Sequence, residues 1–553
     1  MHSKYDAIVI GGGHNGLVAA CYLARAKWKV LVLERRSIVG GACVTEEIFP
    51  GYKISTAAYV NSLFRPEIVR DLNLKAYGFE VIERNPASFS PFLDGRYLML
   101  GRGIEEDARE IAKFSTRDAH AYPKYEAMLG RVASVIEPTL MQAPPNIRRP
   151  RLGDLVAALR LGRSMQRLGS AMTQAVEVLT GAARPILDRW FESEELKGTL
   201  ATDAIIGAFM APSMPGTAYV LFHHVMGETN GKKGVWAYMR GGMGGITQAL
   251  AKAATALGAE IRTDAEVARI VVKNGTATGV VLANGDEIAA RTVASGVDMH
   301  HTFERFIDPQ LLPPDFREAI ARISYDSASL KINAAIDRLP SFTALPGREP
   351  GVQHHGTVHL CPDQDFIERA YDDAKYGRAS REPVVEFQMP SSLDSTLAPP
   401  GKHVVSMFVQ YAPYRLKEGP WTERLKDEFA DRCFAIVERY APGFTESVID
   451  RQILTPPDIE ERFGLTGGNI FQGSMSLDNL FAFRPVPGYA DYRTPIENLY
   501  VCGSAAHPGG GVMGAAGYNA ARVMLRRGVT VPTLPLGRSR GNRRRDARSR
   551  SAD

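Results

Sequence analysis

The sequence predicts an α/β fold whose parallel sheet is assembled from three separated stretches of chain, with an α+β part inserted twice between them. Three observations predict this. A strand, a glycine-rich turn and a helix follow one another at the N-terminus, a glycine turn opens another helix near residue 240, and the full order returns near residue 498. Because 553 residues exceed what one simple hydrophobic core usually contains, we expect two or three domains.

The first of these units begins with a short apolar strand at 7–10, and a helical run follows at 17–24. A second strand at 29–33 ends in Glu34. The turn before the helix contains three glycines in the G-x-G-x-x-G spacing, namely Gly11, Gly13 and Gly16. Glu34 follows them by about 20 residues, which is the full context that a dinucleotide-binding βαβ unit requires. The unit therefore predicts a Rossmann-type domain that binds a nucleotide cofactor.

Each residue of this unit has its own physical role. Gly11 allows the tight turn, Gly13 lets the backbone approach a pyrophosphate because it has no Cβ, and Gly16 lets the helix pack against the strand. The helix N-terminus offers free N–H groups and partial positive charge to the phosphates. Glu34 can accept hydrogen bonds from ribose hydroxyls, which disfavours a 2′-phosphate there.

Two later stretches continue the pattern of the nucleotide-binding part. The glycine pair Gly40-Gly41 follows the second strand, where the backbone can again pass close to a cofactor. A glycine turn at 240–245 opens a further helix. The dipeptides Asn274-Gly275 and Asn284-Gly285 separate alternating apolar runs, which predicts two β-hairpins.

The C-terminal unit indicates which cofactor is bound. A strand at 498–502 leads into the glycine run Gly509 to Gly511, and we expect a helix to start near Val512. Backbone N–H groups of such a turn can lie against a large planar ligand. A helix N-terminus stabilises the negative charge of a reduced flavin, whereas nicotinamide acquires no comparable anion. The unit therefore favours FAD over NAD.

These units divide the chain into six predicted segments. Residues 73–238 are expected to be mostly helical, with a proline-rich break at 143–146, and residues 298–491 to be α+β. The segments are FAD-binding segments at 1–72, 239–297 and 492–527, a helical substrate or lid region at 73–238, a substrate-binding α+β region at 298–491, and a disordered tail at 528–553.

Composition excludes several classes of function. The stretch from Arg538 to Asp553 contains seven arginines and two aspartates, which accounts for the net charge of +5 of the whole chain. The rest is therefore about neutral, and we expect no nucleic-acid binding by the fold. The five cysteines form no C-x-x-C pair, which argues against a disulfide framework, a zinc site or a redox dithiol. We expect no membrane span and no leader peptide, and hence a cytoplasmic location.

The glycine motifs, Glu34 and the C-terminal stretch together resemble the phytoene-desaturase-like FAD oxidoreductases of the glutathione-reductase-type flavoprotein superfamily. Within that superfamily the chain is most similar to the group called pyridine nucleotide-disulphide oxidoreductase domain-containing protein 2. The stretch 507–512 carries most of this match, and the resemblance extends to about Arg527. Without a second glycine turn for NAD and without a C-x-x-C pair, a disulphide reductase is not expected.

The resemblance implies a glutathione-reductase-type fold and non-covalent FAD. The residues that it implies for binding FAD are Gly11, Gly13, Gly16, Glu34, Arg35, Gly40, Gly41, Val267, Gly503, Val512 and Met513. Val267 would meet the adenine with its backbone groups. The chain departs from the family pattern at two positions, where Ala42 stands in place of an arginine and Ser504 in place of an aspartate.

The sequence identifies no clear catalytic residue. His507 lies in the predicted flavin-facing turn and is a weak candidate, although a turn histidine more often bonds the local backbone. Three histidine pairs begin at His223, His300 and His354, and one or more of them could line the substrate cavity. None has the spacing of a metal site, so we expect no metal.

The segment 161–179 places apolar side chains on one helical face and Arg160, Arg163 and Arg167 on the other. The ordinary interpretation is a helix that faces the core with a solvated basic side. The alternative is docking on a membrane surface, through which a lipid-like substrate could enter.

These observations lead to a main hypothesis and two alternatives. The main hypothesis is an FAD-dependent oxidoreductase that transfers hydride between the flavin and a C–H or C–C bond of a hydrophobic, isoprenoid- or polyene-like substrate. Oxygen or a quinone would be the electron acceptor. One alternative is a flavin amine oxidase, which needs an aromatic cage or an acidic anchor that the sequence does not locate. The other is a flavin-binding regulatory protein without turnover.

Overall fold

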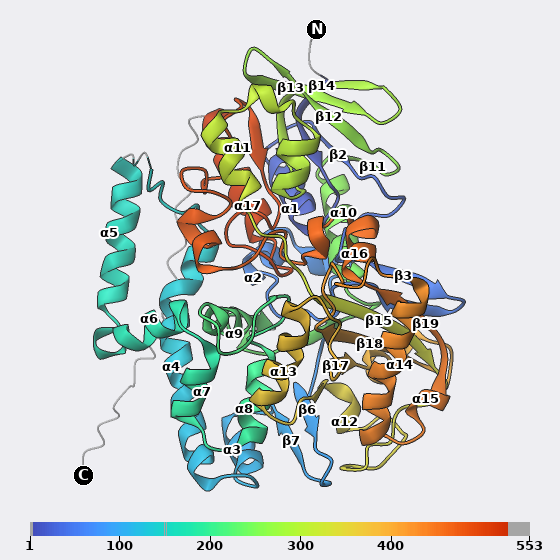
Figure 1. Cartoon of the computed structure of the whole chain (residues 1–553). Helices are drawn as coiled ribbons and strands as arrows, with labels where there is room; N and C mark the ends of the chain where they lie inside the picture. Colours follow the sequence, from blue (N-terminus) through green and yellow to red (C-terminus); the bar gives the residue numbers. More distant parts are fainter. Residues whose placement is uncertain (1–3, 149, 151, 230, 529–553) are drawn as a thin grey trace, which may run out of the picture.

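The computed structural model of the chain describes residues 4–148, 150, 152–229 and 231–528. Figure 1 shows two sheet-containing parts, one above the other, with a group of helices beside the lower part. Apart from residue 528, the predicted disordered tail at 528–553 lies outside the described residues.

The upper part contains a seven-stranded sheet built from all three predicted cofactor segments. Its strands, in chain order, are β1 (Tyr5–Ile10), β2 (Val30–Leu33), β11 (Glu260–Arg262), β12 (Val267–Lys273), β13 (Thr276–Leu282), β14 (Glu287–Ser295) and β20 (Leu499–Val501). Strands β11, β2, β1, β14 and β20 are parallel neighbours in that order. β12, β13 and the first half of β14 form an antiparallel meander, as the two Asn-Gly turns predict. The exact limits of the predicted segments stay a prediction.

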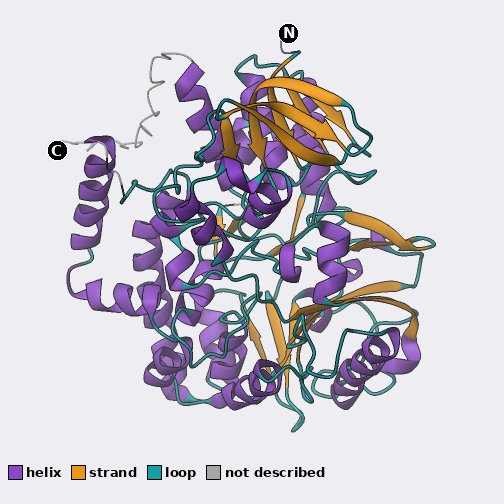
Figure 2. Ribbon diagram, turned by 45° about the horizontal axis from the view of Figure 1, so that its top comes forward, coloured by secondary structure: helices purple, strands orange, loops and turns teal. Residues whose placement is uncertain are grey.

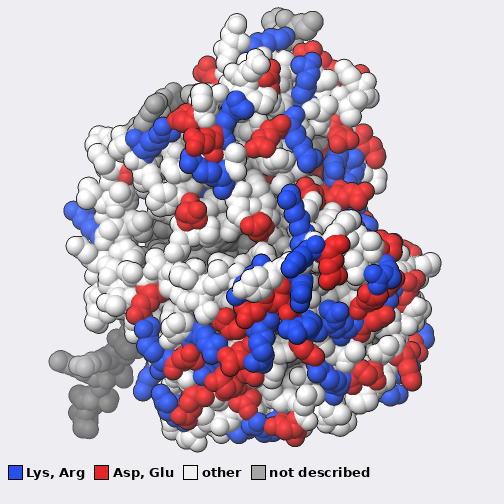
Figure 3. Space-filling model, viewed as in Figure 1, with Lys and Arg blue, Asp and Glu red and all other residues white. Residues whose placement is uncertain are grey.

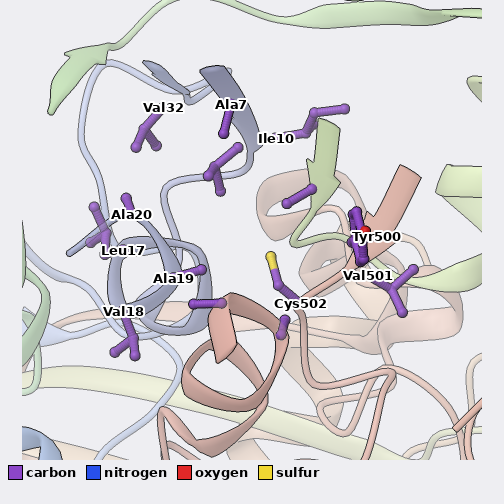
Figure 4. Close-up of a cluster of buried hydrophobic side chains, with 14 of the residues drawn as sticks. Ala7, Ile10, Leu17, Val18, Ala19, Ala20, Val32, Tyr500, Val501 and Cys502 are labelled. Atoms are coloured by element: carbon purple, nitrogen blue, oxygen red, sulfur yellow. The ribbon is translucent and has the colours of Figure 1, made fainter. Parts of the chain in front are cut away.

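Three helices pack around this sheet: α1 (His14–Arg25), α10 (Gly244–Ala256) and α17 (Ala515–Gly528). Figure 4 shows Leu17 and Ala20 of α1 on the side of Val32 of β2, and Ala19 of α1 on the side of Cys502, which follows β20. The same residues belong to one buried core. Because the N-terminal and C-terminal stretches share that core, hydrophobic burial joins segments that lie almost 500 residues apart in the sequence.

The lower part contains a second seven-stranded sheet, which is mostly antiparallel. Its strands, from one edge to the other, are β19 (Val448–Leu454), β15 (Ser329–Ile336), β18 (His403–Gln410), β17 (Val384–Gln388), β16 (Thr357–Leu360), β6 (Ser88–Pro91) and β7 (Tyr97–Leu100). Strands β6 and β7 come from the stretch 73–238, which the sequence analysis describes as mostly helical. Helices α3 (Ile104–Ile111) to α9 (Thr217–Val225) do lie in that stretch, and the structure adds an antiparallel hairpin, closed by the turn at Asp94-Gly95, that pairs with β16. The two insertions therefore share one sheet.

Helices form a layer beside the second sheet (Figure 2). In chain order they are α3 (Ile104–Ile111), α4 (Thr116–Leu140), α5 (Leu152–Gln166), α6 (Met172–Thr180), α7 (Ala183–Trp190), α8 (Glu194–Thr202), α9 (Thr217–Val225) and α13 (Gln364–Lys375). Most of them contribute to a shared apolar core that also contains Tyr411 and Phe471. Helix α5 contributes no buried residue and packs against this core only through the half-buried side chain of Met165.

The expected continuous helix over 161–179 is wrong. The chain ends α5 at Gln166, makes a single 3₁₀ turn at Gly169–Ala171, and starts α6 at Met172. Gly169 has a φ of +53°, a left-handed conformation that interrupts the α-helical hydrogen bonds. The predicted faces survive within α5, where Leu161 and Met165 are half-buried and Arg160 and Arg163 are exposed.

The remaining elements connect or cover these parts. They are β3 (Thr45–Phe49), β4 (Tyr52–Ser55), α2 (Pro66–Asp71), β5 (Val81–Glu83), β8 (Glu228–Thr229), β9 (Lys232–Lys233), β10 (Ala237–Met239), α11 (Pro314–Ala321), α12 (Val352–His355), α14 (Glu423–Tyr440), α15 (Phe444–Ser447) and α16 (Pro456–Phe463). Within the described residues, no helix combines the length and the apolar character needed to cross a membrane.

Candidate functional site

The glycine turn between β1 and α1 lies at the carboxyl edge of the parallel strands, where ligands of such sheets bind. Gly11 has a φ of +93°, and a Cβ on Gly16 would lie 2.2 Å from the carbonyl oxygen of Gly11. A Cβ on Gly13 would meet no atom within 4 Å, and no side chain caps the start of α1. The open space and the uncapped helix end therefore fit a pyrophosphate group.

The glycine pair predicted after β2 packs against this turn. The amide of Gly40 donates to the carbonyl oxygen of Gly12 at 2.9 Å, and a Cβ on Gly41 would lie 3.5 Å from the Cα of Gly13. The two glycine motifs thus form one surface.

Glu34 stands at the end of β2 with 6% of its surface exposed. Its carboxylate accepts the amide of Gly12 at 2.8 Å and the amide of Arg36 at 3.0 Å. These bonds fix the carboxylate beside the turn. Since each oxygen can accept a further hydrogen bond, the side chain also fits a ribose hydroxyl.

One cavity of about 470 Å³ brings the predicted cofactor residues together. The predicted residues that line it are Gly11, Gly13, Gly16, Glu34, Arg35, Gly40, Gly41, Val267 and Val512. Gly503 and Met513 do not line it. Gly503 lies two residues after the end of β20, and a Cβ there would lie 2.4 Å from the carbonyl oxygen of Gly296, which does line the cavity. Met513 is buried against Leu63.

The C-terminal glycine run lies at the cavity, as predicted, but the helix after it begins later than predicted. Gly511 and Val512 line the same cavity as Gly13. Helix α17 begins at Ala515, not near Val512 as expected, because Gly514 has a φ of +75° and so cannot belong to a right-handed helix. A Cβ on Gly510 would lie 2.1 Å from the ring of Phe471, which explains the need for glycine there.

His507 is buried outside the residues that line the cavity. Its Nε2 lies 3.0 Å from the carbonyl oxygen of Thr139, and its own carbonyl oxygen accepts the hydroxyl of Tyr492 at 2.7 Å. Burial lowers the pKa of the His507 imidazole to about 4. These contacts are those of a histidine that holds the turn against α4. Its predicted catalytic role has no contact in the structure that supports it.

Of the three predicted histidine pairs, two contribute one residue each to the cavity wall. His224 and His301 line the cavity, whereas the other members of the three pairs do not. His224 stacks on Trp236 with ring centroids 5.6 Å apart, and His301 Nδ1 lies 3.0 Å from the buried carboxylate of Asp298.

A group of polar residues that the sequence analysis missed lies on the cavity wall formed by the second sheet. Lys331 of β15 lines the cavity and is 2% exposed. Its ammonium group donates to the hydroxyl of Ser406 on β18 and lies 4.8 Å from the ring centroid of Tyr59. Burial lowers the pKa of Lys331 from its ordinary 10.5 to about 7. A lysine within a strand of otherwise uncharged, buried residues is the signal that could have identified it.

Behind Lys331 lies the carboxyl group of Glu386 on β17. The hydroxyl of Tyr59, which also lines the cavity, donates to Glu386 at 3.1 Å, and so does the amide of Gln388 at 3.1 Å. Burial, helped by the charge of Asp203, raises the pKa of Glu386 to about 7. Lys331, Tyr59 and Glu386 thus connect the cavity to a buried acid.

Most of the other residues that line this end of the cavity are apolar or aromatic. The rings of Tyr59 and Phe408 lie 5.5 Å apart. The other lining residues of this character are Leu63, Ile206, Trp236, Leu330, Ile470 and Phe471. The cavity therefore joins a dinucleotide-binding turn to a mostly apolar chamber that contains one buried amine.

Comparison with known proteins agrees with this geometry. The family model described as flavin containing amine oxidoreductase matches residues 16–525. The chain belongs to the flavin-containing amine oxidoreductase family. The protein is accordingly an FAD-dependent oxidoreductase, as the sequence analysis predicts.

Relatives of this family support the predicted resemblance. The chain is 48% identical to the pyridine nucleotide-disulfide oxidoreductase domain-containing protein 2 of Rattus norvegicus, over 95% of this chain and 94% of the relative. A phytoene desaturase of Cereibacter sphaeroides is more distant, with 26% identity over 95% of each chain. The predicted resemblance is therefore confirmed.

A solved structure of a putrescine oxidase variant has a TM-score of 0.60, with 16% identity, and the match covers 95% of this chain and 99% of that one. At that identity the likeness concerns the fold alone. It confirms the mixed α/β architecture with a Rossmann-like cofactor domain.

Proposed function

We propose that this protein is an FAD-dependent dehydrogenase that removes hydrogen from a C–H bond of a hydrophobic, isoprenoid- or polyene-like substrate. The observation that carries the proposal is the continuity of one cavity from the glycine turn and Glu34 to an apolar chamber around Lys331. A bound flavin would supply a two-electron acceptor for hydride. The chain itself would supply binding, exclusion of water and a place for the proton.

The sheet supports FAD in the manner of the glutathione-reductase type. A parallel set of strands with a three-stranded antiparallel meander on one side is present, and the adenine end would lie near Val267 at the start of β12. The cavity also favours non-covalent binding. Cys43 is the one cysteine among its lining residues, and burial raises the pKa of its thiol to about 12. A protonated thiol is a poor nucleophile for attachment to a flavin.

The chamber wall supports a hydrophobic substrate. Aliphatic and aromatic side chains such as Ile206, Trp236 and Phe408 gain free energy when they bury apolar surface of a ligand. They offer few hydrogen bonds to a polar one. Positioning against a flavin in such a dry chamber contributes to the rate by fixing the reacting bond.

Lys331 is the residue that we propose to accept the proton. Formation of a C=C bond from two neighbouring C–H groups releases one hydride, for which a bound flavin would be the acceptor, and one proton. A lysine with a pKa near 7 is partly neutral at physiological pH, so its Nζ can take that proton. Tyr59 beside it and Glu386 behind it would stabilise the ammonium that results, through the ring contact and the nearby carboxyl group.

A flavin amine oxidase is the second candidate. The specific observation in its favour is the pair of rings of Tyr59 and Phe408 next to the carboxyl of Glu386, because aromatic faces and an acid attract a cationic amine. The buried amine of Lys331 in the same wall argues against it, since two cations would repel each other there.

Anaerobic reduction of the flavin tests the proposal. The purified holoenzyme is mixed with a panel of terpenes and polyenes, of amines and of reduced nicotinamides, and bleaching near the flavin absorbance maximum is followed. We expect bleaching by a member of the first group, with a product that contains one more C=C bond. Bleaching and peroxide formation with amines alone would favour the second candidate, and bleaching by no donor would favour a binding protein without turnover.

Re-oxidation of the bleached enzyme then identifies the acceptor. Oxygen and a soluble quinone are added to separate samples, and the return of the flavin absorbance is timed. We propose one of these two as the acceptor, and the faster of the two rates decides between them.

A further inference from the structure

We propose that the outward face of α5 docks this protein on the surface of a membrane that contains anionic lipid. The proposal is independent of the reaction proposed above and concerns a surface far from the glycine turn. Figures 1 and 2 both show α5 standing at the edge of the molecule, apart from the two sheets.

The first half of this face is apolar and open to solvent. Leu152, Leu155, Val156 and Leu159 have exposed fractions of 78%, 50%, 39% and 62%. Their spacing of three, four and seven residues places them on one side of the helix. Soluble proteins rarely leave such a stripe exposed on a helix without a partner for it.

The second half of the same face is basic. Arg160 and Arg163 of α5, and Arg167 one residue beyond its end, follow the leucines on the outward side, and all three are exposed. Within the described part of the chain none of them forms an ion pair. The single acidic residue of α5, Asp154, is half-buried on the opposite side. The charges that α5 presents outward are therefore all positive. In Figure 3 the left flank, where α5 lies in Figure 1, is mostly uncharged with scattered basic side chains.

An apolar stripe followed by arginines matches a bilayer surface better than a second copy of this chain. Leucines can enter the boundary between headgroups and acyl chains while arginines contact anionic headgroups. If two copies of α5 paired in an antiparallel manner, arginines would lie against leucines. If they paired in parallel, arginines would lie against arginines. Both arrangements bury charge without a partner.

The inner face of α5 explains how the helix is held in this position. Ala157, Leu161 and Met165 are half-buried, and Met165 and Leu168 pack against the core of the helical layer. The helix therefore has separate faces for the protein and for the solvent side. Substitutions on the outward face should leave the fold intact, since exposed positions without special contacts tolerate change.

Co-sedimentation with vesicles tests the proposal on the full-length holoenzyme. Vesicles of phosphatidylcholine are compared with vesicles that also contain phosphatidylserine. We expect binding to the second kind only, and weaker binding as salt is added. The variant Leu155→Ser/Leu159→Ser should lower the partition coefficient by about tenfold. The variant Arg160→Gln/Arg163→Gln/Arg167→Gln should lower it by about fivefold for each charge removed.

Two controls keep the result specific to α5. The variant Leu311→Ser/Ile449→Ser removes exposed apolar side chains elsewhere, with exposed fractions of 49% and 51%, and should bind as the wild type does. A chain that ends at Gly528 lacks the arginine-rich C-terminal stretch and should retain the requirement for the α5 leucines. Flavin content and melting temperature are measured for every variant, so that loss of folding is recognised.

Three results would overturn the proposal. The first is equal sedimentation with both kinds of vesicle or with neither. The second is binding that the α5 variants keep and the shortened chain loses, which would assign it to the C-terminal stretch. The third is a dimer in light scattering that Leu155→Ser/Leu159→Ser breaks up without any vesicle binding, which would assign the face to a second copy.

Discussion

At the scale of single residues, substitutions at two glycines of the first turn should affect different properties, one cofactor binding and the other folding. Gly13 has an ordinary φ of −70° and open space where a Cβ would stand, so Gly13→Ala should fold. Its methyl group would occupy the space for a pyrophosphate, and we expect at least about tenfold weaker FAD binding. Flavin absorbance per mole of protein and titration of the apoprotein measure this effect.

Gly16→Ala is the matched comparison. Its Cβ would lie 2.2 Å from the carbonyl oxygen of Gly11, so α1 must move away from β1. We expect a lower melting temperature of the apoprotein itself, which Gly13→Ala should not show. Full FAD affinity in Gly13→Ala would contradict the placement of the pyrophosphate.

Lys331 is expected to control the pH dependence of turnover. Burial lowers its pKa to about 7, so kcat of the wild type should rise with pH through that value as the amine becomes neutral. Lys331→Met should lose about a hundredfold in kcat and lose this rise, with flavin content unchanged. Lys402→Met, at an exposed position, is the control.

The same lysine has a consequence for stability. Between pH 7 and 10.5 the unfolded chain binds a proton that the folded chain lacks, so the free energy of unfolding should rise with pH in that window. Lys331→Met should lack this contribution. Urea unfolding at several pH values measures it, and an unchanged slope in the variant would contradict the assigned burial.

Glu386 should contribute a slope of the opposite sign at lower pH. Its pKa is raised from 4.5 to about 7, so in that window the folded chain holds a proton that the unfolded chain has released. The stability that this proton provides is therefore lost as pH rises from 4.5 to 7. Glu386→Gln should remove the decline, whereas Glu418→Gln at an exposed position should not. The groups around Glu386 that tune its pKa are Tyr59, Arg84, Asp203 and Lys331.

At the scale of elements, the hairpin of β6 and β7 ties the first insertion to the second sheet. Phe89 of β6 is fully buried, and its ring lies 5.2 Å from the ring of Phe342. Phe89→Ala should cost about 3–5 kcal/mol of stability through the cavity it leaves. Leu93→Ala, in the exposed turn of the same hairpin, should cost less than about 0.5 kcal/mol. Equal melting temperatures for the two variants would mean that the hairpin is dispensable.

Two helix boundaries differ from those that the local sequence pattern predicts. The start of α17 at Ala515 follows from the left-handed conformation of Gly514, which a run of small residues does not reveal. The interruption between α5 and α6 follows in the same way from Gly169. In both places the prediction includes the glycine in a helix, whereas its left-handed conformation makes it the point where the helix ends or begins.

At the scale of the whole molecule, one cofactor would contact all three pieces of the upper sheet. Residues of the first, second and third predicted segments, such as Gly13, Val267 and Val512, line the same cavity. FAD should therefore stabilise the folded state as a unit. At a free concentration of one hundred times its Kd, it should add about 2.7 kcal/mol to the free energy of unfolding.

Thermal unfolding of the apoprotein with increasing FAD measures this stabilisation. ADP, which could reach only the end near Glu34 and Val267, serves as the comparison and should raise the melting temperature less. A melting temperature that does not respond to FAD would contradict the cavity as the cofactor site.

The sequence by itself determined the cofactor half of this protein. Gly11, Gly13, Gly16 and Glu34 lie within one βαβ unit, so their spacing and local propensities suffice to predict a nucleotide site and the type of sheet around it. The tertiary structure alone decided the other half. Lys331 and Glu386 lie on β15 and β17, which only their pairing with β18 brings together, and the hydroxyl of Tyr59 reaches Glu386 from the distant loop after β4. Their altered pKa values arise from burial, which depends on every element packed around them and has no local signature in the chain.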